Sequence, residues 1–131
     1  MVVRVGLAIL GLFHVANGLV MLLSPSGWAA RVVHLGTPDR LHLHFIADIA
    51  MAFLASGVGL LLGARRGAVN AMWAVAGATW PALHALLHTK EWILDGPPRA
   101  TGDLINEGAG VILIGAAGVT LAWLRTRQGD A

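Results

Sequence analysis

Two pairs of polar residues stand out because each pair places ionisable side chains on one face of a helix. His44 and Asp48 are four residues apart, and so are His84 and His88. Side chains at this spacing lie one above the other along a helix, and two histidines so placed can hold one metal ion. Each pair could instead be satisfied by hydrogen bonds within a packed bundle. The pairs therefore predict either a ligand site or buried polar packing.

Long apolar segments carry these pairs. The chain has 131 residues, of which 56% are hydrophobic and 12% are charged, whereas soluble domains carry about 25% charged residues. A transmembrane helix needs about 20 apolar residues. Runs of this length predict an all-α fold, an integral membrane four-helix bundle with up-down topology, formed as a single transmembrane domain over residues 1–131. Its helices are expected at about residues 2–23, 41–62, 68–89 and 103–124.

The first segment and the connection after it allow two interpretations each. The first segment resembles a secretory signal peptide in length, but His14 and Asn17 interrupt its apolar core, so we interpret it as a retained helix. In residues 24–41, Trp28, Val32 and Leu35 fall on one helical face. This pattern indicates a short helix lying in the membrane interface, although an irregular loop fits equally well. His34 in this region and His42 just after it are interpreted as interface residues.

Small residues and one proline predict how the helices pack. The pairs Ala55/Gly59 and Ala74/Ala78 recur at four-residue spacing, which permits close contact between helices. Packing within one bundle is the simpler interpretation, and a dimer face is the alternative. Pro81 lies inside the third segment, where a proline usually kinks a helix.

Polar side chains from all four segments are expected to meet in the outer half of the bundle. A rise of 1.5 Å per residue places them roughly 5–13 Å from the outer helix ends. A buried carboxylate needs a partner, and carboxylate with neutral imidazole suits a divalent metal. The residues expected in this outer half are His14, Asn17, His44, Asp48, His84, His88 and Glu107.

The leading hypothesis for these polar residues is that they bind a transition metal. The chain has no cysteine, and ligands of nitrogen and oxygen without sulfur suit zinc, copper, iron or manganese. Glu107 could bind as a fifth ligand or could cap the start of its own helix. His14 and Asn17 are expected to support the site, to replace a ligand, or to form a hydrogen-bonded pair in the core. The four principal ligands are expected to be His44, Asp48, His84 and His88.

Three other functions remain open. Haem b could lie between the second and third segments, with one axial histidine from each, and exchange electrons with quinone. A histidine–carboxylate cluster without a cofactor could relay protons or bind a small polar ligand. The protein could also be an accessory subunit in which the polar residues only fix helix register. A homo-oligomer or a larger membrane complex would fit each function, while a net charge of +2 gives no support for nucleic-acid binding.

Two motifs in the middle of the chain carry a family resemblance. The sequence His44-Phe45-Ile46-Ala47-Asp48-Ile49 is followed by Ala55-Ser56-Gly57 and then by Leu83-His84-Ala85-Leu86-Leu87-His88. This combination resembles a group of small uncharacterised bacterial four-helix membrane proteins with a His-Phe-x-x-Asp motif and a later His-x3-His. The resemblance covers about half the chain. It implies a four-helix membrane bundle and no particular activity.

The positive charges predict the orientation in the membrane. Five arginines and lysines lie near one set of segment ends and four near the other, and positive residues favour the cytoplasmic side. We therefore expect a multi-pass protein of the inner (plasma) membrane with both termini in the cytoplasm. The five residues on the cytoplasmic side are Arg4, Arg65, Arg66, Arg125 and Arg127.

Overall fold

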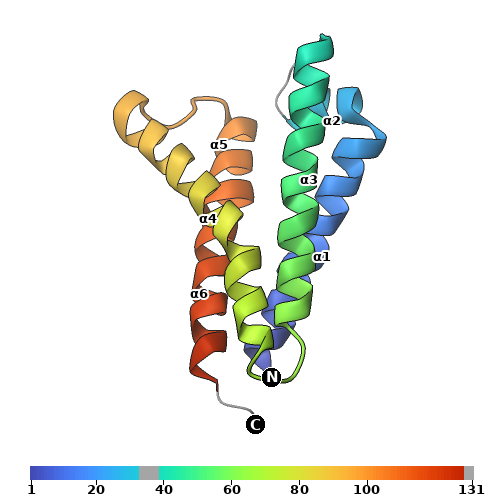
Figure 1. The fold of residues 1–131 in the computed structure, drawn as a ribbon. Coiled ribbons are helices and arrows are strands. Elements are labelled where there is room, and N and C mark those ends of the chain that lie inside the picture. The colour runs from blue at the N-terminus through green and yellow to red at the C-terminus, as the bar shows by residue number, and fades with distance from the viewer. Residues whose placement is uncertain (33–38, 129–131) are drawn as a thin grey trace.

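The computed structural model describes residues 1–32 and 39–128, and all regular elements in these ranges are helical. Four long helices run up and down, and the first and last begin and end at the same end of the bundle (Figure 1). The predicted all-α, up-down fold is therefore confirmed, as is a short helix after the first segment. The elements are α1 (Val2–Leu23), α2 (Pro25–Val32), α3 (Arg40–Gly63), α4 (Asn70–Asp95), α5 (Thr101–Glu107), the π-helical segment η1 (Gly108–Leu113) and α6 (Ile114–Arg127).

Three helices of the described chain are long and apolar enough to cross a membrane. They are α1, α3 and the continuous helix Thr101–Arg127, which comprises α5, η1 and α6. Helix α4 has 26 residues but is not among these candidates, because polar and charged residues interrupt its second half. A multi-pass membrane protein is thus supported by three spans, and a fourth span through α4 remains a prediction.

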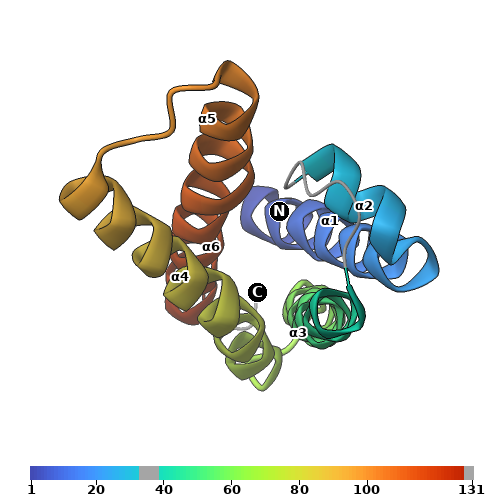
Figure 2. The ribbon, with the colours of Figure 1, turned by 90° about the horizontal axis from the view of Figure 1, so that it is seen from above.

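Helix α3 packs against both α1 and α4, while α6 packs against α4 and α1 (Figure 2). Glycines allow α3 and α4 to approach each other closely. A Cβ atom added to Gly77 would lie 2.5 Å from the backbone nitrogen of Leu60, and one added to Gly59 would lie 2.7 Å from the Cα atom of Gly77. Ala74 and Ala78 are also buried in the core. The small residues therefore serve packing within one bundle, as the simpler interpretation expected.

Helix α4 has two halves that pack on different partners. Its first half lies on α3 through Gly77, while its second half leans away from α3 beyond Pro81, which lies inside the helix (Figure 1). There the helix meets α6, where a Cβ atom on Gly115 would lie 2.5 Å from the Cβ of Ala85. Because proline removes one helical hydrogen bond and crowds the preceding turn, it accounts for the change of direction. The second half of α4 is thereby carried to the helix that contains Glu107.

The end of α4 differs from the expected boundary. The helix continues to Asp95 and stops at Gly96, which has φ 85° and whose N–H donates to the carbonyl of Trp92. Such a left-handed position favours glycine, and two prolines follow it. Residues 90–95 were expected in a loop but are helical, which places Glu91 one turn after His88.

Two arginines close the opposite end of the bundle. Arg125 is 3% exposed, and its guanidinium donates to the carbonyls of Gly63 at 3.2 Å, Arg65 at 3.1 Å and Gly67 at 2.8 Å. The Nε atom of Arg4 donates to the carbonyl of Ala64 at 2.9 Å. These carbonyls end α3 and begin the turn to α4, where a positive charge also opposes the negative helix end. Both arginines thus hold the turn in addition to contributing to the charge bias.

Candidate functional site

The second half of α4 and the end of α5 bring one imidazole and two carboxylates together. The Nδ1 atom of His88 lies 3.4 Å from an oxygen of Glu91 and 3.3 Å from an oxygen of Glu107. The side chains of His88, Glu107 and Glu91 are 21%, 30% and 50% exposed, respectively. The Nδ1 atom itself is buried and makes no hydrogen bond of good geometry within the described chain. These three residues, named here the His88 cluster, form a partly enclosed acidic site with one titratable ring.

Trp92 fixes one carboxylate of the His88 cluster. Its indole Nε1–H donates to Glu107 at 2.7 Å, and the indole lies against Gly108, where an added Cβ would come within 3.1 Å of the ring. Glu107 is followed directly by the π-helical residues Gly108–Leu113. Short π-helical segments are rare and are frequent at functional sites. The position of Glu107 is therefore set both by the indole and by a break in regular α-helix geometry.

A row of aromatic rings runs from the His88 cluster into the bundle. The ring of His88 is 4.8 Å from that of His84, which stacks on Trp80 at 5.0 Å. Trp80 in turn contacts Phe53 of α3 at 4.8 Å, and Phe53 lies 5.4 Å from His14 of α1. The row crosses from α4 to α3 at the contact of Trp80 with Phe53, and from α3 to α1 at the contact of Phe53 with His14.

The other predicted ligand pair lies on the surface of the bundle. His44 and Asp48 are 3.4 Å apart, but their side chains are 69% and 61% exposed. The prediction that this pair lines the same interior layer as His84 and His88 is wrong, because the inward face of α3 is made of other residues, among them Ile46 and Ala50. The spacing alone specified a shared face, and the packing of α3 decided which way that face points.

The donor set does not fit the metal site that the sequence suggested. Within residues 1–32 and 39–128, no group of three or more histidine, aspartate or glutamate side chains is arranged to hold a metal ion. A haem between α3 and α4 would need an inward-facing histidine on α3, yet the two histidines of that helix, His42 and His44, are 54% and 69% exposed. Neither donor set is therefore preformed as predicted, and cofactor binding remains a prediction.

His14 and Asn17 do not bond to each other, contrary to one expectation. The Nδ1–H of His14 donates to the carbonyl of Leu10 at 2.8 Å, while Asn17 accepts the indole N–H of Trp28 at 3.1 Å and donates to the sulfur of Met21 at 3.6 Å. Helix α2 folds back over α1 and offers Asn17 this stronger donor. The predicted positions of His34 and Leu35 lie outside the described residues.

Glu107 does not cap the start of a helix. It is the last residue of α5, and the acidic residue in the first turn of that helix is Asp103. Two residues of the site, Glu91 and Trp92, were missed because residues 90–95 were expected to form a loop. They follow His88 by three and four residues, so a longer helix would have placed both beside its face.

The start of α3 carries a separate histidine–carboxylate contact. Asp39 precedes the helix and accepts hydrogen bonds from the backbone N–H of His42 at 2.9 Å and from its ring Nδ1–H at 2.8 Å. The hydrogen bond from the backbone N–H of His42, followed by that from its ring, lowers the pKa of the Asp39 carboxyl. This arrangement is a helix cap, and it accounts for His42 without a ligand.

Comparison of the chain with protein-family models, curated proteins and solved structures finds no match. The resemblance to small four-helix membrane proteins therefore remains a prediction that depends on the two motifs alone. The chemistry that the site can perform has to be inferred from its geometry. One imidazole nitrogen facing two carboxylates is suited to binding a proton.

Proposed function

We propose that this chain is a multi-pass membrane protein whose His88 cluster binds a proton at one end of the bundle and passes it inward. One observation carries the proposal: the buried Nδ1 atom of His88 faces oxygens of Glu91 and Glu107 at 3.4 and 3.3 Å. An unprotonated nitrogen would present a lone pair to two carboxylates, which repels them. The neutral ring makes the same geometry attractive when its one proton is on Nδ1, and a further proton on the other ring nitrogen would place a cation beside both carboxylates.

The charges of the cluster give the physical reason for proton uptake. Oxygens of Glu91 and Glu107 both lie within 3.4 Å of the Nδ1 atom of His88. A proton carried by the ring would therefore be held between two carboxylates, and hydrogen bonds between charged groups are stronger than neutral ones. Glu91 is the most exposed of the three side chains and would receive the proton from solvent.

His84 supplies the next proton acceptor. Its ring lies 4.8 Å from that of His88 and one helical turn deeper. Beyond it, Trp80 and Phe53 separate His84 from His14, and phenylalanine cannot carry a proton. The cluster therefore supports uptake at one surface and transfer as far as His84, and a complete path across the membrane would need a further subunit or water.

The indole N–H of Trp92 provides a direct test because it is bonded to Glu107. In detergent-solubilised protein, nitrogen–proton NMR should show the Trp92 indole signal moving as the pH is varied over the range in which the protein stays folded. Glu107→Gln should remove that movement, and His88→Asn should reduce it. The matched control is the indole of Trp28, which donates to the uncharged side chain of Asn17 and should not move.

The same titration separates the competing functions. A Trp92 signal that stays fixed across this pH range in the folded protein would contradict the proton-binding proposal and favour a structural role for the cluster. A Trp92 signal that changes only when zinc is added would favour the metal-binding hypothesis in its place. Retained absorption in the visible range after gentle purification would favour haem.

The membrane topology is tested independently by cysteine labelling. The chain has no cysteine, so single cysteines at the exposed positions Val69 and Pro97 report on opposite ends of α4. An impermeant maleimide added to intact cells should label Pro97→Cys and leave Val69→Cys unlabelled. The reverse pattern would contradict the proposed orientation, and equal labelling of both would contradict a spanning α4.

A further inference from the structure

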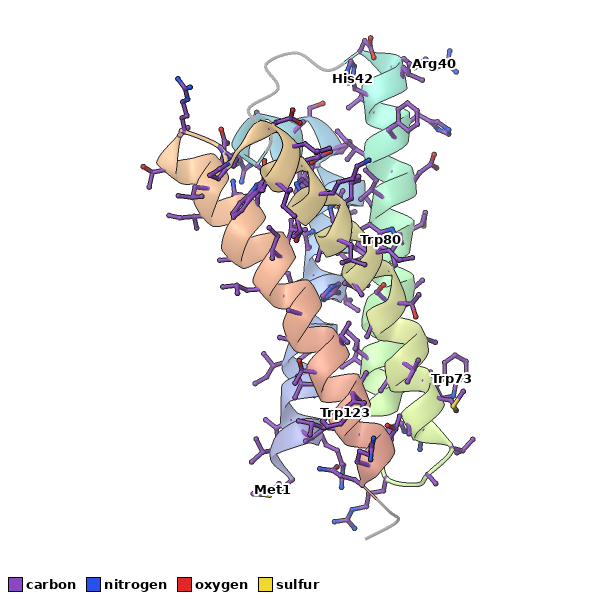
Figure 3. All side chains as sticks on the ribbon, turned by 90° about the vertical axis from the view of Figure 1, so that its left-hand side faces the viewer. Met1, Arg40, His42, Trp73, Trp80 and Trp123 are labelled. Atoms are coloured by element: carbon purple, nitrogen blue, oxygen red, sulfur yellow. The ribbon has the colours of Figure 1, made fainter. Side chains whose placement is uncertain are left out.

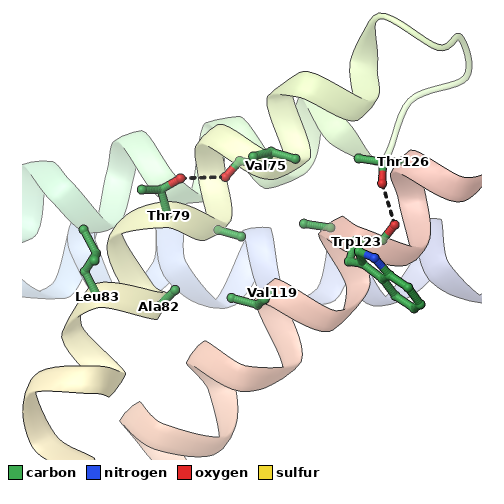
Figure 4. Close-up of a pocket in the computed structure, with 9 residues that line it drawn as sticks. Val75, Thr79, Ala82, Leu83, Val119, Trp123 and Thr126 are labelled. Atoms are coloured by element: carbon green, nitrogen blue, oxygen red, sulfur yellow. Dashed lines mark hydrogen bonds between the residues drawn. The ribbon is translucent and has the colours of Figure 1, made fainter. Parts of the chain in front are cut away.

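A groove of about 370 Å³ runs along the surface that α4 and α6 form together (Figure 4). It is lined mainly by aliphatic side chains of both helices. Its two hydroxyls are already used, since Thr79 donates to the carbonyl of Val75 at 2.9 Å and Thr126 donates to that of Trp123 at 2.7 Å. Side-chain hydroxyls that are bonded within their own helices leave an apolar wall. The lining residues are Val75, Ala78, Thr79, Ala82, Leu83, Val119, Ala122, Trp123 and Thr126.

One end of the groove is basic. Trp123 lines it, and the guanidinium carbon of Arg127 lies 5.0 Å from the centre of the Trp123 ring. Trp123 and Met1 mark this end of the bundle in Figure 3, opposite Arg40 and His42. The two exposed arginines of the α3–α4 turn, at positions 65 and 66, are also at this end. Every aspartate and glutamate within residues 1–32 and 39–128 belongs to the opposite half of the helices.

We propose that this groove binds one anionic phospholipid, with an acyl chain along α4 and α6 and the phosphate beside Arg127. The apolar wall lies on the surface of a spanning helix. Water is absent there, and a lipid acyl chain is the available occupant. The charge at the groove end is complementary to an anionic headgroup, and a basic residue at a membrane surface attracts such lipids. Trp123 lies between the two regions, as tryptophan does at membrane interfaces.

Charge and groove shape make separate predictions. Arg127→Gln removes the headgroup contact and should lower the preference for phosphatidylglycerol over phosphatidylcholine about fivefold, the effect of one basic residue at such a surface. Ala82→Phe and Val119→Phe fill the groove from opposite walls and should weaken binding of both lipids. Arg31→Gln, an exposed arginine on α2, and Val58→Phe, on the exposed side of α3, are the matched controls and should bind as the wild type does.

Native mass spectrometry of the detergent-purified chain, titrated with the two lipids carrying identical acyl chains, measures these affinities. Equal retention of both lipids by the wild type, or unchanged retention in both groove-filling variants, would overturn the proposal. A wild-type dimer that Val119→Phe converts to a monomer would also overturn it, because the groove would then be an interface between copies. Circular dichroism and thermal unfolding identify a variant that has lost its fold, and the second groove variant then decides.

This inference depends on the proposal that the chain spans a membrane but not on the His88 cluster. A chain that purifies from the soluble fraction without detergent would refute the membrane proposal itself. Failure of the lipid preference in a detergent-dependent protein would refute the groove alone. Loss of the Trp92 response to pH would leave the lipid result unchanged.

Discussion

Replacing Arg125 with alanine should destabilise the bundle more than any other single change at its basic end. The guanidinium is 3% exposed and donates three hydrogen bonds to the carbonyls that end α3 and form the turn to α4. Hydrogen bonds of charged groups contribute about 1.5–3 kcal/mol each, and the two shorter bonds, to the carbonyls of Arg65 and Gly67, contribute most. From these two bonds we expect a loss of about 3–6 kcal/mol in the free energy of unfolding.

The assay is reversible unfolding in a defined detergent micelle without phospholipid, followed by circular dichroism. Arg127→Ala is the matched control, since that exposed arginine contacts only the ring of Trp123 in the described chain and should cost about 0.5–1 kcal/mol. Arg125→Lys keeps the charge but not the planar fork of donors, so its stability should lie between the two. Equal unfolding energies for Arg125→Ala and Arg127→Ala would refute the reasoning, and full stability of Arg125→Lys would show that charge alone matters.

Three further changes test other contacts. Gly77→Ala places a Cβ atom against the backbone of α3 and should lower the free energy of unfolding by about 1–3 kcal/mol; unchanged stability would contradict the close approach of α3 and α4. Trp28→Phe removes the hydrogen bond to Asn17 and should cost about 1 kcal/mol, an effect that should be absent when Asn17 is already alanine. The lowered pKa of Asp39 means that its cap is fully formed above the ordinary carboxyl pKa of about 3.9 and is lost as pH falls through the lower folded value. The His42 amide proton signal should follow that acid transition, and Asp39→Asn should abolish it.

The fold could be predicted from the sequence because apolar runs of spanning length leave few other structures. The bounds of α1 agree with the expectation, and α3 agrees to within one residue at each end. The carboxyl end of α1 is defined locally, by Ser24-Pro25. The end of α4 was misplaced because polar residues after His88 suggested a loop, whereas the helix has no breaker between His88 and Gly96. Polarity marks the membrane boundary, and backbone conformation marks the helix end.

The candidate site could be predicted only in part. Depth along a helix follows from residue count, and His88 and Glu107, expected at similar depth, lie 3.3 Å apart in the structure. The direction of a helical face depends on rotation about the helix axis, which residue count does not specify. His44 and Asp48 share a face as predicted, yet that face is exposed because Ile46 and Ala50 turn inward against α1 and α2.

The sequence by itself determined that the chain forms long apolar helices, with acidic residues toward one end and five of the nine arginines and lysines toward the other. Only the tertiary structure decided which polar groups meet. Pro81 redirects α4 from α3 to α6 and η1, which brings His88 to Glu107 across 19 positions of the chain. The tertiary structure also buries Arg125 among carbonyls about 60 positions away. Such meetings depend on helix rotation and crossing angle, which are fixed by packing between helices that no local pattern describes.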